Sequence, residues 1–242
     1  MCGTEGHTSL VFRENHISMS RLDKVRARIQ KAATAAGRSA AEIVLLAVSK
    51  KQPLERVQAL INAGHRCFGE NYVDEALEKM AKLRATALEW HFIGPIQSNK
   101  TRQLAEHFDW VQSLDRAKIV RRLNEQRPHG APPLNVLIQV NIDAEPQKSG
   151  CAPADLEALA GTVCEAPNLR LRGLMAIPAP RTDSSEQAAV FARLRSVFES
   201  LRQRYPDMDT LSAGMSADLE AAIAHGSTMV RVGTDLFGPR PD

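Results

Sequence analysis

The sequence predicts an α/β fold, a (β/α)8 barrel of the TIM type with an extra N-terminal helix. Apolar strand-like runs alternate with amphipathic helical patterns, and eight such runs occur in 242 residues. Alternation with short connections favours a parallel sheet, and eight strands in this length favour closure into a barrel over an open sheet. The chain carries no composition break or repeat that would mark a second domain.

The extra helix is predicted over Ser20 to Ala36, where apolar residues recur at helical spacing until Gly37 ends the pattern. The residues before it contain charged and histidine side chains that interrupt any apolar core of a secretion signal. We therefore expect a flexible leader over residues 1–17 and a single barrel domain over residues 18–242.

The first strand is predicted at Ile43 to Val48, an unbroken apolar run typical of a parallel strand covered on both faces. Pro53 opens the following helix and Gly64 closes it. The other predicted strands are Arg66–Gly69, Glu89–Ile93, Trp110–Ser113, Asn135–Val140, Arg170–Met175, Thr210–Ser212 and Met229–Val232. The other predicted helices are Tyr72–Leu83, Lys100–Phe108, Arg116–Gln126, Ala154–Glu165, Ser185–Arg204 and Ala217–His225, with Asp115, Asp183 and Ser216 as N-caps.

Composition limits the classes of partner. Hydrophobic residues make up 43% and no run is long enough to span a bilayer, so no membrane association is expected. The net charge is +3, but basic residues alternate with acidic ones, as in Asp115 to Arg127, so no nucleic-acid binding is expected. The four cysteines lack the paired spacing of zinc or redox motifs, so no metal site is predicted, and reduced thiols fit a cytoplasmic protein.

Two loops near the C-terminus predict an anion site. In such barrels functional groups gather at the carboxyl ends of strands, and phosphates often bind the loops after strands seven and eight. Gly214-Met215-Ser216 and Gly233-Thr234 occupy these loops and offer backbone N–H groups and hydroxyls. Either loop alone is better explained by turn and cap chemistry, but both together favour phosphate binding.

Lys50 directly follows the most apolar strand, so its amine is positioned to enter the barrel mouth, where partial loss of water favours a neutral, nucleophilic amine. The alternative is a solvated loop lysine, which is our interpretation of Lys51. A Schiff-base lysine facing a phosphate site suggests pyridoxal 5'-phosphate. Arg231 could then face the pyridine nitrogen, where its permanent charge would discourage ring protonation; otherwise it satisfies barrel carbonyls or a carboxylate.

These motifs resemble the pyridoxal-phosphate homeostasis protein family, which is similar to the barrel domain of alanine racemases. The resemblance spans nearly the whole chain and rests on Ala47-Val48-Ser49-Lys50, Phe68-Gly69-Glu70-Asn71-Tyr72, Trp90 to Gly94 with Gln97 to Lys100, Gly173 to Pro178, Leu211 to Ser216 and Met229 to Gly238. It implies an aldimine of the cofactor on Lys50, phosphate contacts from Ser216, Gly233 and Thr234, and Arg231 at the pyridine nitrogen. It also implies wall residues at Asn71, His91, Met175 and Ser212.

Two lysine positions qualify the resemblance. Many relatives carry a second lysine two positions after the first, where this chain has Gln52, so any role of that amine in cofactor exchange is in doubt here. Lys148 resembles another lysine near the barrel mouth and could hold a second cofactor molecule; a solvated loop lysine is the competing interpretation.

The expected function is vitamin B6 homeostasis: a cytoplasmic monomer that holds pyridoxal phosphate and buffers or delivers it to PLP-dependent apoenzymes. Racemisation needs proton donors on both faces of a carbanion, and the only tyrosines are Tyr72 and Tyr205. Tyr72 follows Asn71 near the rim and is expected as a packed helix-start residue more than as an acid, and Tyr205 is expected at the end of a surface helix. A PLP-dependent racemase or decarboxylase using Lys50 as its base remains an alternative. A cofactor-free sugar-phosphate aldolase is another.

Overall fold

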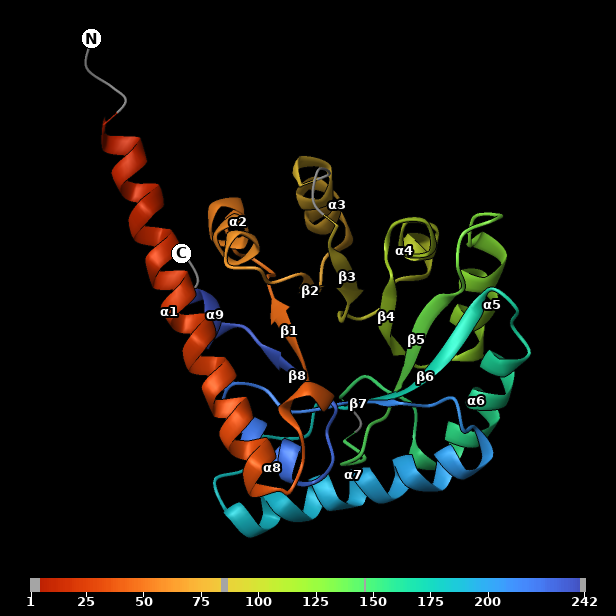
Figure 1. Cartoon of the computed structure of the whole chain (residues 1–242). Helices are drawn as coiled ribbons and strands as arrows, with labels where there is room; N and C mark the ends of the chain where they lie inside the picture. Colours follow the sequence, from red (N-terminus) through yellow and green to blue (C-terminus); the bar gives the residue numbers. More distant parts are fainter. Residues whose placement is uncertain (1–4, 84–86, 146, 240–242) are drawn as a thin grey trace.

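The computed structural model describes residues 5–83, 87–145 and 147–239. Its eight strands form one closed barrel in chain order, and every neighbouring pair is parallel. The last strand closes the barrel on the first, with Val44 opposite Met229 and Ala47 opposite Val232. Figure 1 shows the helices around the outside of the strands. The predicted (β/α)8 barrel with an N-terminal helix is confirmed.

The strands are β1 (Val44–Val48), β2 (Cys67–Glu70), β3 (Glu89–Phe92), β4 (Trp110–Leu114), β5 (Leu134–Gln139), β6 (Leu169–Met175), β7 (Thr210–Ser212) and β8 (Met229–Val232). The helices are α1 (Glu5–Ala35), α2 (Leu54–Asn62), α3 (Val73–Lys82), α4 (Thr101–His107), α5 (Ala117–Gln126), α6 (Leu156–Cys164), α7 (Ser184–Arg204), α8 (Leu219–Ala224) and α9 (Thr234–Phe237). Most predicted boundaries agree within two residues, the usual uncertainty at element ends.

The strands are buried along their length, which explains why they appear in the sequence as apolar runs. All residues of β4, β7 and β8 are buried, since one face packs inside the barrel and the other lies beneath the helices. Glycine and proline act at the helix ends as expected: Pro53 is the N-cap of α2, and Gly64 follows that helix with a φ of +86°, where a side chain would be strained.

Helix α1 begins earlier than predicted. Its backbone is helical from Glu5, so residues 5–17, expected as part of a flexible leader, continue the predicted helix in the structure. The division of the chain at residue 18 stays a prediction. From Leu22 onward α1 buries apolar side chains, including Val25 and Ile29, and it packs against α2, α8 and α9 (Figure 1). It therefore bridges the first and last helices of the ring.

Two predicted caps are wrong, and one helix was not predicted. Asp183 does cap α7 by accepting from the N–H groups of Ser185 and Glu186. Asp115 instead accepts from Arg116 Nη1. Ser216 lies in a turn before α8, whose N-cap position is taken by Asp218. Helix α9 has a single turn and is too short to leave a periodic signal in the sequence.

Among the described residues no helix combines the length and apolar character needed to cross a bilayer. The cysteines at 67, 151 and 164 are unpaired, as expected for reduced thiols, while Cys2 lies outside the described residues.

Candidate binding site at the mouth of the barrel

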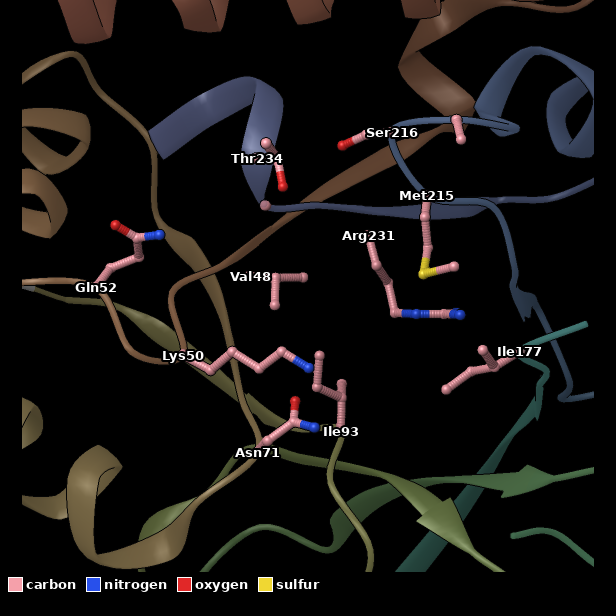
Figure 2. Close-up of a pocket in the computed structure, with 12 residues that line it drawn as sticks. Val48, Lys50, Gln52, Asn71, Ile93, Ile177, Met215, Ser216, Arg231 and Thr234 are labelled. Carbon is pink, nitrogen blue, oxygen red and sulfur yellow. The ribbon is translucent and has the colours of Figure 1, made fainter. Parts of the chain in front are cut away.

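A cavity of about 280 Å³ opens at the carboxyl ends of the strands. This volume lies just below the roughly 300–1,000 Å³ of common small-ligand sites. Its lining comes from β1 and β8 and from the segments that follow β1, β2, β3, β6, β7 and β8: Val48, Lys50, Gln52, Asn71, Ile93, Ile177, Met215, Ser216, Ala217, Arg231, Gly233 and Thr234. Figure 2 shows Lys50 and Arg231 extending into the same space from different sides.

A tight turn after β1 directs Lys50 into the cavity. The N–H of Gln52 donates to Ser49 O at 3.1 Å, and Lys51 adopts a left-handed conformation with a φ of 56°. The Lys51 N–H donates to Glu75 Oε1 on α3 at 2.6 Å, which fixes the turn. As a result Lys50 points inward while Lys51 is exposed, as the sequence predicted for this pair.

A buried charged network supports this turn, and sequence reasoning missed it. Lys79 Nζ on α3 donates to Ser49 O at 2.6 Å and pairs with Glu70 Oε1 at 2.7 Å. Ser49 Oγ donates to the same carboxylate oxygen at 2.6 Å. Burial raises the pKa of Glu70, while Lys79 and Ser49 act in the opposite direction. The available signal was an acidic residue at the end of a buried strand.

Arg231 is 4% exposed and anchored on two sides. Its Nη1 donates to Ser212 Oγ and its Nη2 to Ala176 O, both at 2.8 Å. Burial lowers the pKa of Arg231 to about 10, so the guanidinium stays charged near neutral pH. Arg231 therefore donates to a backbone carbonyl, as in the alternative considered from the sequence, and it also lines the cavity.

The two loops predicted to hold an anion meet at one side of the cavity. The hydroxyls of Ser216 and Thr234 lie on the same side in Figure 2, and Gly233 adjoins Thr234. Arg28 of α1 connects the loops: it donates to Ser216 O at 2.8 Å and forms ion pairs with Glu220 of α8 and Asp235 of α9. A helix outside the barrel thereby orients both loops.

Six of the nine predicted site residues line the cavity: Lys50, Asn71, Ser216, Arg231, Gly233 and Thr234. Ser212 lies behind the lining and is joined to it through Arg231. His91 and Met175 are fully buried inside the barrel. Each lies two residues before a residue that does line the cavity, Ile93 and Ile177 respectively. Ile93 and Ile177 follow the ends of β3 and β6, so His91 and Met175 lie deeper in the barrel than the cavity lining, and their contact with a cofactor stays a prediction.

Three other positions considered from the sequence differ in whether they line the cavity. Gln52 lines the cavity and accepts from Arg56 Nη1 at 3.1 Å. Lys148 pairs with Glu145 at 2.6 Å and is not in the lining. Tyr72 is 50% exposed at the start of α3, rather than packed as expected, and it too is outside the lining. The apolar lining residues Ile93, Ile177 and Met215 lie within motifs noted in the sequence, but they were not predicted as site residues.

Comparison with known proteins identifies the family. The family model for the alanine racemase N-terminal domain matches residues 20–241. A pyridoxal phosphate homeostasis protein from Pseudomonas aeruginosa is 60% identical over 217 residues, covering 90% of this chain and 93% of that protein. One from Escherichia coli strain K12 is 56% identical over 222 residues, covering 90% and 95%. The chain belongs to the pyridoxal phosphate homeostasis protein family.

Solved structures agree with this assignment. PipY of Synechococcus elongatus with PLP bound is 34% identical, with a TM-score of 0.79, and the match covers 91% of this chain and 100% of that one. The PLP-free structure of PipY gives a TM-score of 0.81. Alanine racemase from Corynebacterium glutamicum shares the fold at 17% identity and a TM-score of 0.66, and the match covers 62% of that longer chain.

Proposed function

We propose that this protein binds pyridoxal 5'-phosphate at the mouth of its barrel and serves intracellular vitamin B6 homeostasis. One observation carries the proposal: the amine-bearing side chain of Lys50, the charged Arg231 and the two hydroxyl-bearing loops line a single cavity. This arrangement offers an amine for an aldehyde and N–H and O–H donors for a phosphate. Family membership supports the same ligand.

The residues present fit such a ligand. Asn71 Oδ1 is a buried acceptor that has no hydrogen-bond partner among the described residues, so a ligand donor could satisfy it. Gly233 has no side chain, and an added Cβ would sit 3.4 Å from Val48 O, in space that a phosphate could otherwise approach. Thr234 begins helix α9, so its N–H is free of the intrahelical ladder.

Pyridoxal phosphate supplies an aldehyde that condenses with primary amines and a pyridine ring that withdraws electrons, most strongly when its nitrogen is protonated. Lys50 provides the amine. Arg231, held by Ser212 and Ala176, places a permanent positive charge in the cavity, which opposes protonation of a nearby ring nitrogen. The site therefore favours holding the cofactor over activating it for amino-acid chemistry.

The lining also bears on the alternative of a racemase or decarboxylase. Neither Tyr72 nor Tyr205 is among the residues that line the cavity, so no tyrosine of the described chain is placed to donate a proton there. We therefore infer a carrier or regulator without robust turnover. The cofactor-free aldolase reading is disfavoured by the family assignment.

The wider setting belongs to the same proposal. We infer a cytoplasmic monomer that buffers the cofactor or delivers it to PLP-dependent apoenzymes. The unpaired thiols of Cys67, Cys151 and Cys164 support a reducing compartment. Light scattering coupled to size exclusion tests the monomer, with and without an apoenzyme present.

The experiment compares wild type, Lys50→Ala and Lys51→Ala in titrations with pyridoxal phosphate, followed by absorption spectroscopy. We expect wild type and Lys51→Ala to show the same shift of the visible band on binding, and Lys50→Ala to lose it. An unchanged shift in Lys50→Ala would contradict the proposal. Incubation of the loaded protein with amino acids, analysed by chiral chromatography, tests turnover; rates of about 1 s⁻¹ or more would favour the enzyme alternative.

A further inference from the structure

Three potential metal ligands meet at the other end of the barrel, where the strands begin. Cys67 is the first residue of β2 and Glu89 is the first residue of β3. The register places Cys67 opposite Glu89, and His91 lies two residues further along β3 on the same face as Glu89. Their side-chain donor atoms all lie within 4.8 Å of one another. This cluster lies outside the cavity described above.

The spacing of the three donor atoms suits tetrahedral coordination. His91 Nε2 is 2.8 Å from Glu89 Oε1 and 3.3 Å from Cys67 Sγ, and Cys67 Sγ is 3.4 Å from Glu89 Oε1. Ligands bound tetrahedrally at roughly 2.0 to 2.3 Å from Zn²⁺ lie roughly 3.3 to 3.6 Å apart. His91 Nε2 and Glu89 Oε1 would have to separate by about 0.5 Å to accept an ion between them, and the two pairs that include Cys67 Sγ by less.

Access and donor type are also favourable. His91 is fully buried, Cys67 is partly buried, and the Glu89 side chain is 47% exposed, so the cluster is open to solvent on one side. One thiolate, one imidazole and one carboxylate form a mixed set that suits a borderline-soft divalent ion, with a water in the fourth position. A hard ion such as Mg²⁺ would prefer oxygen ligands.

Trp110 and Gln112 hold the ring of His91 in place, as neighbouring groups usually do for a metal-binding histidine. The ring of His91 stacks on Trp110 with centroids 5.1 Å apart, and its Nδ1 is 2.8 Å from the side-chain amide of Gln112. In the metal-free protein, Gln112 Nε2 donates to Nδ1 and His91 Nε2 donates to Glu89. When Nε2 binds an ion, Nδ1 carries the proton and donates to Gln112 Oε1 after the amide turns over. The same turn brings Gln112 Nε2 to Ser212 Oγ, which then accepts from Gln112 in place of donating to it.

We propose that Cys67, Glu89 and His91 bind a divalent ion of the Zn²⁺ and Co²⁺ class at the amino-terminal end of the barrel. Binding forms bonds to Sγ, Nε2 and one carboxylate oxygen, and the Cys67 thiol releases one proton to solvent. The imidazole exchanges one tautomer for the other without a net change in protons. The proposal does not depend on cofactor binding at the mouth.

Sequence spacing did not predict this site, because residues 67 and 89 are brought together only by the pairing of β2 with β3. The competing explanation is a polar cluster that satisfies its own hydrogen bonds and binds no ion. The two explanations differ in whether the thiol becomes a metal-bound thiolate.

The test is a titration of the full-length, chelator-treated protein with Co²⁺, followed by its electronic spectrum and then by competition with Zn²⁺. We expect one equivalent of Co²⁺ to give a thiolate-to-metal charge-transfer band and the intense d–d bands of tetrahedral coordination, all removed by Zn²⁺. Cys67→Ser should lose the charge-transfer band and bind at least about tenfold more weakly, a difference of about 1.4 kcal/mol. Glu89→Gln should keep the charge-transfer band and bind more weakly.

Matched controls are Cys164→Ser, which removes an exposed cysteine elsewhere, and Cys2→Ser, which removes the cysteine outside the described residues. Both should bind Co²⁺ like wild type. Absence of a charge-transfer band in wild type, or its persistence in a folded Cys67→Ser protein, would overturn the proposal. Circular dichroism of each variant establishes that it is folded.

Discussion

The two ends of the barrel surround their buried ionisable side chains with different partners. At the carboxyl end, buried ionisable groups have polar partners: Glu70 pairs with Lys79 although burial raises its pKa, and Arg231, whose pKa burial lowers to about 10, donates to Ser212 and Ala176. At the amino end, burial favours neutral groups: it lowers the pKa of His91 and raises that of the Cys67 thiol. The carboxyl end is thus prepared for an anionic ligand. The amino end holds a neutral imidazole and a neutral thiol beside the carboxylate of Glu89, whose pKa the hydrogen bond with His91 lowers to about 2.

A chain of hydrogen bonds joins the two ends through the barrel interior. Arg231 Nη1 donates to Ser212 Oγ, which donates to Gln112 Oε1 at 2.7 Å. Gln112 Nε2 in turn contacts His91 Nδ1, and His91 contacts Glu89. Satisfied networks of this kind rigidify a core, since every buried polar group must keep its partner. The difference between the ends is therefore maintained within one connected interior.

The largest expected effect tests the charged end. Lys79→Met removes the cation that pairs with fully buried Glu70, and leaving a buried carboxylate without its partner should lower the free energy of unfolding by about 3 kcal/mol. Urea denaturation measures this. Lys82→Met, on the exposed side of the same helix, is the control and should change stability by less than about 0.5 kcal/mol. Equal effects of the two changes would show that the buried pair of Lys79 and Glu70 does not contribute to the stability of the fold.

That pair also marks the limit of what the sequence could predict. The eight strands, the ring of helices and the cavity-facing Lys50 follow from local patterns: apolar runs, helix-end residues and position after a strand. The contacts of Lys79 with Ser49 and Glu70 depend on how α3 packs, which no local pattern encodes. The family resemblance implied His91 as a wall residue of the site, whereas the layer that a side chain occupies depends on barrel geometry.

A second prediction tests the neutral end. Burial lowers the pKa of His65, whose Nε2 contacts Cys67 O at 2.8 Å, from 6.5 to about 4, and Arg26 and Arg66 act in the same direction. Between these values the unfolded chain binds a proton that the folded protein excludes, so stability falls as the pH is lowered through this window. From pH 7 to pH 5 this histidine should contribute a loss of about 2 kcal/mol.

Urea denaturation at the two pH values, compared between wild type and His65→Gln, measures this contribution. His91 titrates in the same direction because burial also lowers its pKa, so the variant should retain part of the pH dependence. The same pH dependence in both proteins would mean that His65 is not held neutral.

A smaller effect is expected from loosening the mouth without touching the ligand. Arg28→Ala removes the hydrogen bond to Ser216 O and the ion pairs to Glu220 and Asp235, so both loops of the proposed phosphate site lose a common support. Affinity for pyridoxal phosphate should weaken by about tenfold, or about 1.4 kcal/mol. Arg26→Ala, an exposed change on the same helix, should leave the affinity unchanged. Binding curves followed by absorbance measure the affinity of each variant, and equal affinities would contradict this role of Arg28.

The central claim is that Lys50, at the charged end, carries the cofactor. Borohydride reduction of the protein saturated with pyridoxal phosphate, followed by peptide mapping with mass spectrometry, tests it most directly. We predict one reduced phosphopyridoxyl group, located on Lys50. A protein that takes up no label, or carries it on Lys51 or Lys148 in place of Lys50, would contradict this account of the site.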